Sequence, residues 1–410
     1  MSAPVLYISY DGMTDPLGQS QVIPYLTGLA EKGYAIELIS FEKKKAFEKN
    51  AVVIKDILKG SNIQWHPLTY TKSPPIFSTV WDLIRMRFKV LTLYRKYRFK
   101  IVHCRSYIPA FAGLSLRKKY GVKFIFDIRG FWIEERVDGN IWNLSNPFYK
   151  QVYRYFKKKE KEFFSMADYV ISLTHKAKDE ILSWKNTSAG PLKIEVIPTC
   201  VDTKLFSQAN VISQQLTDFK QRYGITGNDF ILSYLGAIGT WYMLDEMLDF
   251  FTVLLSEKPN AKFLFITHES EQNIRMKSRQ LNIPDKNIIV NKADRHEVPA
   301  LLSLSDFSIA FIKPAYSKMA SSPTKFGELL SMGIPFICNR AVGDMEEIVN
   351  KYNCGILADG FSENDYRNVI KQMKNMGKPD AIRLRRAAED YFSLSGGIEK
   401  YDAVYKKLLT

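Results

Sequence analysis

A short stretch in the second half of the chain has the residue types of an anion-binding helix start. Ser322 or Thr324 can cap a helix that has Pro323 in its first turn. The unpaired backbone amides of such a helix start, together with the helix dipole, attract an anion. Lys325 adds a full positive charge, and Glu328 follows one turn later, where it can accept hydrogen bonds from ribose hydroxyls. The same spacing fits an ordinary helix with a surface lysine and glutamate, so the spacing alone leaves both interpretations open.

Residues 11–21 form a long polar segment between a predicted strand and a predicted helix. Gly18 lets the backbone approach a ligand because it has no Cβ atom. Gln19 can hydrogen-bond a diphosphate or an acceptor substrate. The segment is not a Gly-x-Gly-x-x-Gly fingerprint, which argues against a dinucleotide cofactor. An ordinary loop with a helix cap is the alternative. We favour a binding role, because long loops at strand ends often carry function.

Ionisable and aromatic residues gather at the end of another predicted strand, between Asp127 and Arg136. Arg129 can bind a phosphate or a substrate that donates a group, and Asp127 or Glu134 can receive the proton of the hydroxyl that accepts the group. Parallel sheets place their chemistry at the carboxyl ends of strands, which is where these residues fall. A structural network of ion pairs explains the same residues equally well.

His103 and Arg105 lie near the end of the preceding predicted strand. A histidine at this point is as often part of a core as of a site, whereas Arg105 lies closer to the strand end and is the better site candidate. The other histidines and the four cysteines lack metal-ligand spacing. The sequence therefore predicts no metal site.

Runs of β-branched and apolar residues alternate with helical patterns through both halves of the chain. Continuously apolar runs are typical of parallel strands covered on both faces. In the first half the predicted strands are 5–10, 35–41, 63–69, 101–106, 123–129, 169–173 and 194–198. In the second half they are 230–235, 262–267, 287–290, 307–311, 335–338 and 355–358. The alternation predicts an α/β protein with two doubly wound, Rossmann-like domains that face each other across a cleft.

The alternation stops between residues 207 and 229, where the chain is polar and has no clear pattern. We therefore predict an N-terminal domain over residues 1–206, a linker over 207–229 and a C-terminal domain over 230–392. A last helical pattern, within residues 393–410, can pack back on the N-terminal domain.

The composition is ordinary for a soluble globular protein, with 46% apolar and 25% charged residues. The N-terminus has neither the basic region nor the apolar region of a signal peptide, and no run approaches the roughly 18 apolar residues that a membrane span needs. Four cysteines in 410 residues suit a reducing compartment. These features predict a cytoplasmic protein.

The formal net charge of +15 calls for an anionic partner. Residues 81–163 contain 20 Lys or Arg and 7 Asp or Glu, so nearly all of the excess lies in this region. Phe77, Trp81, Ile84 and Phe88 recur at helical spacing among arginines and lysines, a pattern that can lie on anionic lipid. Alternatively, the apolar stripe is core and the cations solvate the outer face. The clustering of charge favours the membrane surface.

The sequence Ser-Pro-Thr-Lys-x-x-Glu followed by Gly-x-Pro, at 322–335, closely resembles the donor-site helix of glycosyltransferase family 4. Other segments fall in that family's order: 196–202 resembles its Pro-Asn-Gly-Val-Asp segment, and 234–239 resembles the opening of its second domain. The resemblance implies the GT-B fold, in which the C-terminal domain binds the nucleotide sugar and the N-terminal domain serves the acceptor. It also implies retaining transfer from a UDP- or GDP-type donor, with no cofactor and no required metal.

From the motifs and the resemblance together we predict two sets of site residues. The predicted catalytic residues are Asp127, Arg129, Glu134, Lys325 and Glu328. The predicted donor-binding residues are Gly18, Gln19, Gly236, Gly239, Ser322, Thr324, Lys325 and Glu328.

The sequence departs from the family's pattern at three places. The family often has two glutamates separated by seven residues; Glu328 matches the second, but Ala320 occupies the position of the first. Many members have basic residues just after the opening glycine of the second domain, and 239–243 has none. Arg129 occupies the place of a histidine that usually touches the donor sugar. Arg129 is therefore the first candidate for a group that replaces the missing ones.

The predicted function is a hexosyltransferase-like enzyme that moves a sugar from a nucleotide diphosphate to a hydroxyl acceptor. The basic region predicts a sugar or lipid-linked acceptor in polysaccharide or glycoconjugate biosynthesis, with the protein peripheral on the inner face of the plasma membrane. A nucleotide-sugar epimerase or hydrolase on the same fold is one alternative. A non-catalytic basic anion-binding protein is another, although the sequence has no recognised nucleic-acid motif and nucleic acid is not an expected partner.

Overall fold

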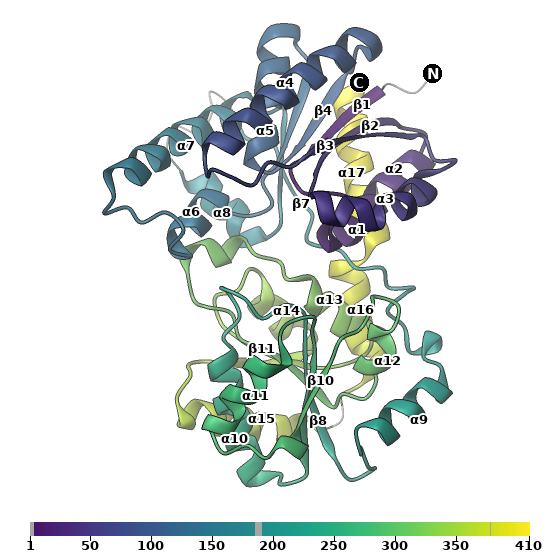
Figure 1. Ribbon diagram of the computed structural model, residues 1–410, viewed down its shortest axis with the longest axis vertical. Coiled ribbons are helices and arrows are strands. Elements are labelled where there is room, and N and C mark those ends of the chain that lie inside the picture. Colours follow the sequence, from purple (N-terminus) through teal and green to yellow (C-terminus); the bar gives the residue numbers. More distant parts are fainter. Residues whose placement is uncertain (1–3, 185–190, 378) are drawn as a thin grey trace. The chain divides into compact units, whose positions relative to one another are not determined.

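The computed structural model describes residues 4–184, 191–377 and 379–410, and the chain divides into two compact units (Figure 1). The first unit comprises Met1–Thr199, Tyr316–Ser321 and Leu394–Thr410, and the second comprises Cys200–Ala315 and Ser322–Ser393. The chain therefore passes between the units four times.

The first unit is built on a seven-stranded sheet whose neighbouring strands are all parallel, in the order β3-β2-β1-β4-β5-β6-β7. The strands are β1 Pro4–Ser9, β2 Ala35–Glu42, β3 Ile63–Thr69, β4 Ile101–Arg105, β5 Lys123–Asp127, β6 Tyr169–Ser172 and β7 Ile194–Val196. Each coincides with a predicted apolar run. Strand order reverses between β1 and β4, and open α/β sheets bind ligands at such a reversal, beyond the carboxyl ends of the strands.

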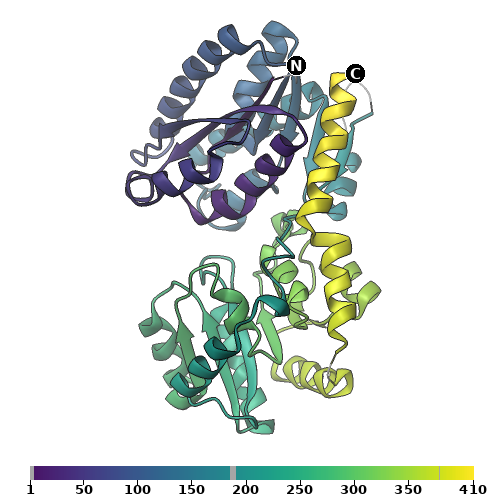
Figure 2. The same cartoon turned by 90° about the vertical axis from the view of Figure 1, so that its right-hand side faces the viewer.

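Helices cover both faces of this sheet, with α2, α3 and α17 on one side and α4, α5 and α7 on the other (Figures 1 and 2). The helices of the first unit are α1 Pro16–Gln21, α2 Ile23–Glu31, α3 Lys44–Leu58, α4 Phe77–Tyr97, α5 Tyr107–Tyr120, α6 Trp132–Asp138, α7 Pro147–Met166, α8 His175–Ser183, the short 3₁₀ helix η3 Tyr316–Ala320 and α17 Leu394–Leu409. Because both faces are covered, the central strands β1, β4 and β5 are buried almost throughout, which explains why they are mostly apolar without alternation. The edge strand β3 is largely exposed or partly exposed.

The second unit has a six-stranded parallel sheet in the order β10-β9-β8-β11-β12-β13, again with a reversal, here between β8 and β11. The strands are β8 Phe230–Leu235, β9 Ala261–Ile266, β10 Ile288–Asn291, β11 Phe307–Ala310, β12 Phe336–Asn339 and β13 Gly355–Ala358. The helices are η1 Gln208–Asn210, α9 Ser213–Arg222, α10 Leu244–Glu257, α11 Glu271–Gln280, η2 Asp285–Asn287, α12 Val298–Leu302, α13 Thr324–Ser331, α14 Met345–Tyr352, α15 Glu363–Met376 and α16 Ala381–Phe392. The two parallel sheets with their helices confirm the predicted two-domain α/β fold.

Residues 207–229, for which we predicted a linker, contain the helix α9 and belong to the second unit. Phe219 and Tyr223, four residues apart, pack against the core of that unit, and their rings stack with centroids 6.5 Å apart. The signal is weak in the sequence because α9 has no fully buried residue and presents mostly polar side chains.

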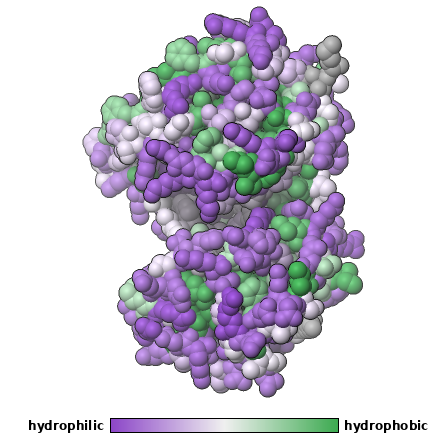
Figure 3. Space-filling view, turned by 45° about the vertical axis from the view of Figure 1, so that its right-hand side comes forward, coloured by the Kyte–Doolittle hydropathy of each residue, from purple (hydrophilic) through white to green (hydrophobic). Residues whose placement is uncertain are grey.

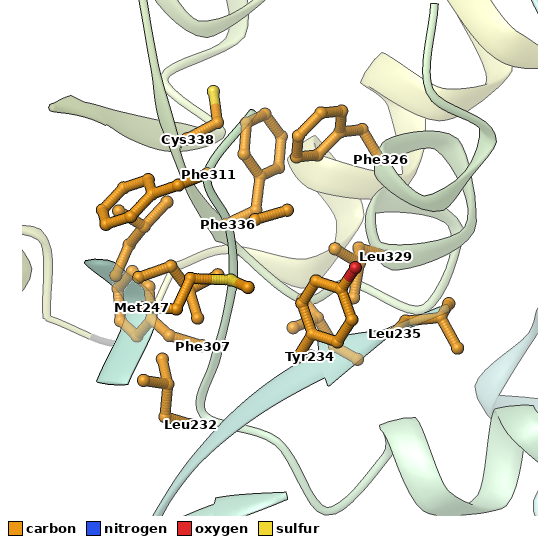
Figure 4. Packing of buried hydrophobic residues seen from close by; sticks show 14 of the residues in the cluster. Leu232, Tyr234, Leu235, Met247, Phe307, Phe311, Phe326, Leu329, Phe336 and Cys338 are labelled. Carbon is orange, nitrogen blue, oxygen red and sulfur yellow. The ribbon is translucent and has the colours of Figure 1, made fainter. Parts of the chain in front are cut away.

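The core of the second unit fixes the position of helix α13. Figure 4 shows Phe326 next to Phe336 of β12, and Leu329 near Tyr234 and Leu235 of β8. The ring centroids of Phe326 and Phe336 are 4.6 Å apart, and both side chains are fully buried. Burying an aromatic side chain of this kind contributes roughly 1.5–3 kcal/mol, so the helix is firmly anchored at the carboxyl end of β8.

The C-terminal helix α17 lies along the first unit next to α2 (Figures 1 and 2). Asp402 accepts a hydrogen bond of 2.7 Å from Tyr34, and Glu399 pairs with Lys32 at 2.6 Å. Five of its side chains are buried, namely Tyr401, Asp402, Val404, Tyr405 and Leu408. These contacts make α17 part of the first unit, although the second unit precedes it in the sequence.

The face of the molecule drawn in Figure 3 is mostly hydrophilic, with separate smaller hydrophobic areas. Every helix in the described residues is too short or too polar to span a lipid bilayer.

Candidate active site

Helix α13 begins directly at the residues that the sequence singled out. Thr324 is its first residue, and Pro323 occupies the N-cap position with an extended backbone. The prediction that Ser322 or Thr324 caps this helix, with Pro323 in its first turn, was therefore wrong. A proline side chain has no hydrogen-bonding atom, so no side chain of the N-cap residue competes for the first amides of α13. Ser322 is buried beside this start, and Thr324 is partly exposed.

Lys325 is buried at the start of α13, at the carboxyl end of β8. Its Nζ donates a hydrogen bond of 3.1 Å to the hydroxyl of Tyr234 and lies 3.5 Å from the ring centroid of Tyr242. Burial lowers the pKa of Lys325 well below its usual value, and the charge of Glu328 only partly opposes this. The site thus holds a desolvated amine, and an anion that binds next to it would favour the protonated, positively charged form.

Gly236 lets the end of β8 lie against this amine. Its φ of +110° is a conformation that glycine alone adopts readily, and a Cβ atom there would lie 3.5 Å from Lys325 Nζ. Gly239 differs, since a Cβ atom on it would meet no heavy atom within 4 Å. The structure therefore brings Gly236 and Lys325 together but gives no packing reason for glycine at 239.

Glu328 lies one turn after Lys325 and is also buried. Its Oε1 accepts a hydrogen bond of 2.9 Å from Nη1 of Arg295, which follows β10. Burial raises the pKa of Glu328, while Arg295 and Lys325 oppose that rise. Arg295 was not among the predicted site residues, although it is a cation in a polar segment that follows a predicted strand.

In the first unit, Asp127 ends β5 and is completely buried. Its Oδ2 accepts hydrogen bonds from the hydroxyl of Tyr401 at 3.0 Å and from Nε2 of His103 at 3.4 Å. Burial alone would raise the pKa of Asp127, but Arg129, His103 and Arg105 outweigh it and lower the pKa below its usual value. Asp127 therefore stays a carboxylate, and within the described residues its Oδ1 has no hydrogen-bond partner.

Arg129 follows in the left-handed conformation, with φ of +51°, which is uncommon for a residue with a side chain. Its buried Nε and Nη1 also lack partners among the described residues. The charge of Arg129 acts on Asp127, as in the alternative of a structural ion network, but among the described residues one acceptor atom of Asp127 and two donor atoms of Arg129 have no hydrogen-bond partner. Buried polar atoms of this kind usually have a partner, so these three atoms are able to bind an incoming polar group.

The remaining site predictions in the first unit have other environments. Glu134 on α6 accepts a hydrogen bond of 3.1 Å from Tyr153 and pairs with Lys157 of α7 at 3.1 Å. The structure therefore commits Glu134 to holding two helices together. Arg105 is buried, and its Nε donates a hydrogen bond of 3.3 Å to Asp11 after β1.

We predicted a loop for Gly18 and Gln19, but both residues lie in helix α1. A Cβ atom on Gly18 would lie 2.1 Å from the carbonyl oxygen of Gly12, so close packing inside the segment explains this glycine. Gln19 donates a hydrogen bond of 3.1 Å to the carbonyl of Thr14. A donor-binding role for either residue remains a prediction.

Glu42, at the end of β2, organises this segment and was not predicted. Its buried carboxylate accepts hydrogen bonds from the amides of Met13 and Thr14, at 2.8 and 3.0 Å, and from the hydroxyls of Thr14 and Ser40, both at 2.5 Å. In the sequence Glu42 reads as an ordinary polar residue after an apolar run, so only the tertiary structure reveals its role.

His103 is a core histidine with two hydrogen bonds. Nδ1 contacts the hydroxyl of Tyr405 at 2.8 Å, and burial lowers the pKa of the ring despite the neighbouring Asp127. Helix α17 therefore supplies Tyr401 to the carboxylate and Tyr405 to the histidine.

Replacing Tyr401 by phenylalanine should lower the free energy of unfolding by ~1.5–3 kcal/mol, the usual contribution of a hydrogen bond to a charged group. Replacing Tyr405, whose partner is the neutral His103, should cost only about 1 kcal/mol. Urea unfolding followed by circular dichroism measures both values. A larger loss for Tyr405→Phe than for Tyr401→Phe would contradict the assignment of Asp127 as a buried carboxylate.

In the described part of the chain, His, Cys, Asp and Glu side chains form no group of three or more that would suit a metal ion. The independence from metal remains a prediction.

Two family models match the chain. Residues 21–205 match the model described as Glycosyltransferase Family 4, and residues 216–390 match the model described as Glycosyl transferases group 1. A comparison with curated proteins found no match.

Solved structures with the same fold align over nearly the whole chain. Sucrose-phosphate synthase from Thermosynechococcus elongatus is 14% identical, with a TM-score of 0.75 and 99% of each chain covered. HepE of Anabaena, solved in complex with UDP-glucose, is 12% identical, with a TM-score of 0.68, and 99% of this chain and 100% of that chain are covered. WaaG, a glycosyltransferase involved in lipopolysaccharide biosynthesis, is 15% identical, with a TM-score of 0.67, and 98% of this chain and 99% of that chain are covered. At such identities the likeness concerns the fold.

Proposed function

The chain belongs to glycosyltransferase family 4, and from this premise we propose that it transfers a glycosyl group, with retention, from a nucleoside diphosphate to a hydroxyl acceptor. The observation that carries the proposal is the pair Lys325 and Glu328, buried one turn apart at the start of α13. An amine, the first amides of a helix and a carboxylate match the diphosphate and the ribose of such a donor.

Lys325 and the first amides of α13 stabilise the leaving diphosphate. As the glycosyl bond breaks, negative charge grows on the β-phosphate oxygen, and preorganised donors in a desolvated site stabilise that charge strongly. The lowered pKa of Lys325 supports this role, because an approaching diphosphate favours the ammonium form and draws a proton onto the amine.

Glu328 serves the ribose. Its Oε1 is held by Arg295, so its other oxygen is oriented to accept hydrogen bonds from the ribose hydroxyls. Because Glu328 is buried, the loss of such bonds would leave its second carboxylate oxygen without a partner, which makes the contact selective for a ribose diol.

Retention requires no nucleophile from the protein in this proposal. The acceptor hydroxyl attacks the anomeric carbon from the side that the diphosphate leaves, and the departing phosphate oxygen takes the hydroxyl proton. In the first unit, the uncommitted oxygen of Asp127 and the uncommitted nitrogens of Arg129 suit a hydroxyl or phosphate group of one of the two substrates.

The UDP-glucose bound to HepE, a protein of the same fold, makes a UDP-sugar the first donor to test. The acceptor we propose is a sugar or lipid-linked hydroxyl at a membrane surface, in the biosynthesis of a polysaccharide or glycoconjugate. The net charge of +15, concentrated in the first unit, supports an anionic surface as the place of reaction.

A thermal-shift screen with UDP, GDP and their sugars tests the donor site. At a ligand concentration of about 100 times Kd, binding to the native state adds ~2.7 kcal/mol and raises Tm by several degrees. NAD is the control and should leave Tm unchanged. Failure of every nucleoside diphosphate and nucleotide sugar to raise Tm would refute the proposed site, and nucleotide release or sugar epimerisation that needs no acceptor would refute transfer as the reaction.

A further inference from the structure

Helix α4 of the first unit has two apolar faces, and only one of them is used by the fold. Met86, Val90 and Leu93 are buried in the core of the first unit. On the other side, the exposed fractions of Phe77, Trp81, Ile84 and Phe88 are 71%, 55%, 43% and 69%. A helix at a protein surface normally shows water its polar side, so four large exposed side chains on one helix require a partner.

The four exposed residues form one continuous stripe. Their spacing of four, three and four residues places them on the same side of α4, one turn above another. This side lies opposite the buried residues, so the stripe is not an extension of the core. The sequence left open whether these residues are core or surface, and the structure places them on the surface.

The charges around the stripe are of one sign. Residues 72–100 contain eight basic residues and a single acidic one, Asp82. Asp82 is fully buried and accepts hydrogen bonds from Tyr10 at 3.0 Å and Thr71 at 2.8 Å, and it pairs with Arg85 at 3.4 Å. The exposed side of α4 therefore carries no carboxylate. Arg87 and Arg95 lie exposed on the same helix, and Lys89 lies partly exposed.

We propose that the outward face of α4, defined by Phe77, Trp81, Ile84 and Phe88, docks in the interfacial region of an anionic lipid bilayer. Apolar side chains flanked by cations match a surface that has an anionic headgroup layer above an apolar interior. Trp81 carries an apolar ring with one polar N–H, which suits the boundary between the two. Nucleic acid would pair with the cations but gives large aliphatic and aromatic side chains no apolar environment.

The proposal rests on the proposed function, because it names the surface on which the acceptor would be presented. It has its own test. Binding to sedimented vesicles of phosphatidylcholine, with and without phosphatidylglycerol, is measured for the wild-type protein and for Trp81→Ser/Phe88→Ser. We expect wild type to bind only the anionic vesicles, more weakly as salt rises, and the double variant to partition at least about tenfold less.

The matched control is Val52→Ser/Ile57→Ser on α3, which removes two exposed apolar side chains, 68% and 48% exposed, outside α4. This variant should bind anionic vesicles as the wild-type protein does. Trp81→Phe adds a local readout, because brominated lipid should quench tryptophan fluorescence in the wild-type protein and quench it less in Trp81→Phe, which keeps an aromatic ring and still binds.

Equal binding by wild type and Trp81→Ser/Phe88→Ser would overturn the proposal, as would equal loss in the α3 control. Binding to duplex DNA without binding to anionic vesicles would also overturn it. The same holds if the wild-type protein binds no vesicles but self-associates, and Trp81→Ser/Phe88→Ser abolishes the self-association. Nucleotide-induced thermal shifts are measured on the same variants and should match wild type. A failed nucleotide shift with intact vesicle binding would refute the proposed function alone, and the reverse result would refute the docking surface alone.

Discussion

Replacing Lys325 by methionine is expected to reduce turnover by roughly 10²- to 10³-fold, the usual effect of removing one donor that stabilises developing charge. Methionine keeps the length and apolar stem of the side chain, so Tyr234 and Tyr242 retain their packing partner. Initial-rate kinetics with a saturating nucleotide sugar measures the loss. The matched control is Lys262→Met, near the amino end of β9 and therefore at the opposite end of the parallel strands from Lys325. Near-normal turnover in Lys325→Met would refute its role.

The same variant should change how stability depends on pH. Burial lowers the pKa of Lys325, so between that lowered pKa and the usual value of about 10.5 the unfolded chain holds a proton that the folded protein lacks. Stability therefore rises with pH in this window, and the rise should disappear in Lys325→Met. Calorimetry in buffers of different ionisation enthalpy should also detect proton uptake when a nucleoside diphosphate binds wild type, and less uptake with the variant.

Replacing Glu328 by glutamine should raise the KM for the donor by roughly 10- to 100-fold, since a hydrogen bond to a charged group is worth ~1.5–3 kcal/mol. The effect on kcat should be smaller, because ribose contacts form in the ground state as well as in the transition state. Glutamine preserves the shape of the side chain, which separates loss of charge from loss of packing. Glu257→Gln, on α10, is the control for loss of one carboxylate of an ion pair in the same unit.

A double-mutant cycle with Arg295→Met tests whether Arg295 acts through Glu328. The two residues are in direct contact, so the KM for the donor should rise less in the double variant than the product of the two single-variant increases. Strict additivity would mean that Arg295 touches the nucleotide independently. An unchanged KM in Glu328→Gln would contradict the ribose assignment.

Most strands of the two sheets were predictable because parallel strands buried on both faces leave an apolar run in the sequence. The helix that carries Lys325 and Glu328 was predictable because proline, small polar residues and glycine mark helix ends. The environment of these residues was not. That Tyr234 and Tyr242 surround the amine, and that Arg295 holds the carboxylate, depends on which strand lies next to which. Local sequence says nothing about this order.

The errors also have physical reasons. The cap of α13 was assigned to the wrong residue because several residues around a proline can start a helix, and the sequence does not decide among them. In the structure Pro323 itself occupies the N-cap position. Gly18 looked like a ligand-facing glycine, whereas its neighbour in space is the backbone of Gly12. Tyr401 and Tyr405 escaped notice because about 270 and 300 residues separate them from Asp127 and His103 along the chain. Only the packing of α17 on the first unit joins them.

That packing also bears on how the protein is made. The polypeptide leaves the ribosome from its N-terminus, so the first unit must wait, without α17, until the whole of the second unit has been synthesised. During that time the surface that later receives Tyr401, Val404 and Tyr405 is uncovered, and Asp127 lacks the hydroxyl that donates to it. The nascent first unit therefore keeps this partly apolar surface exposed until α17 has been synthesised.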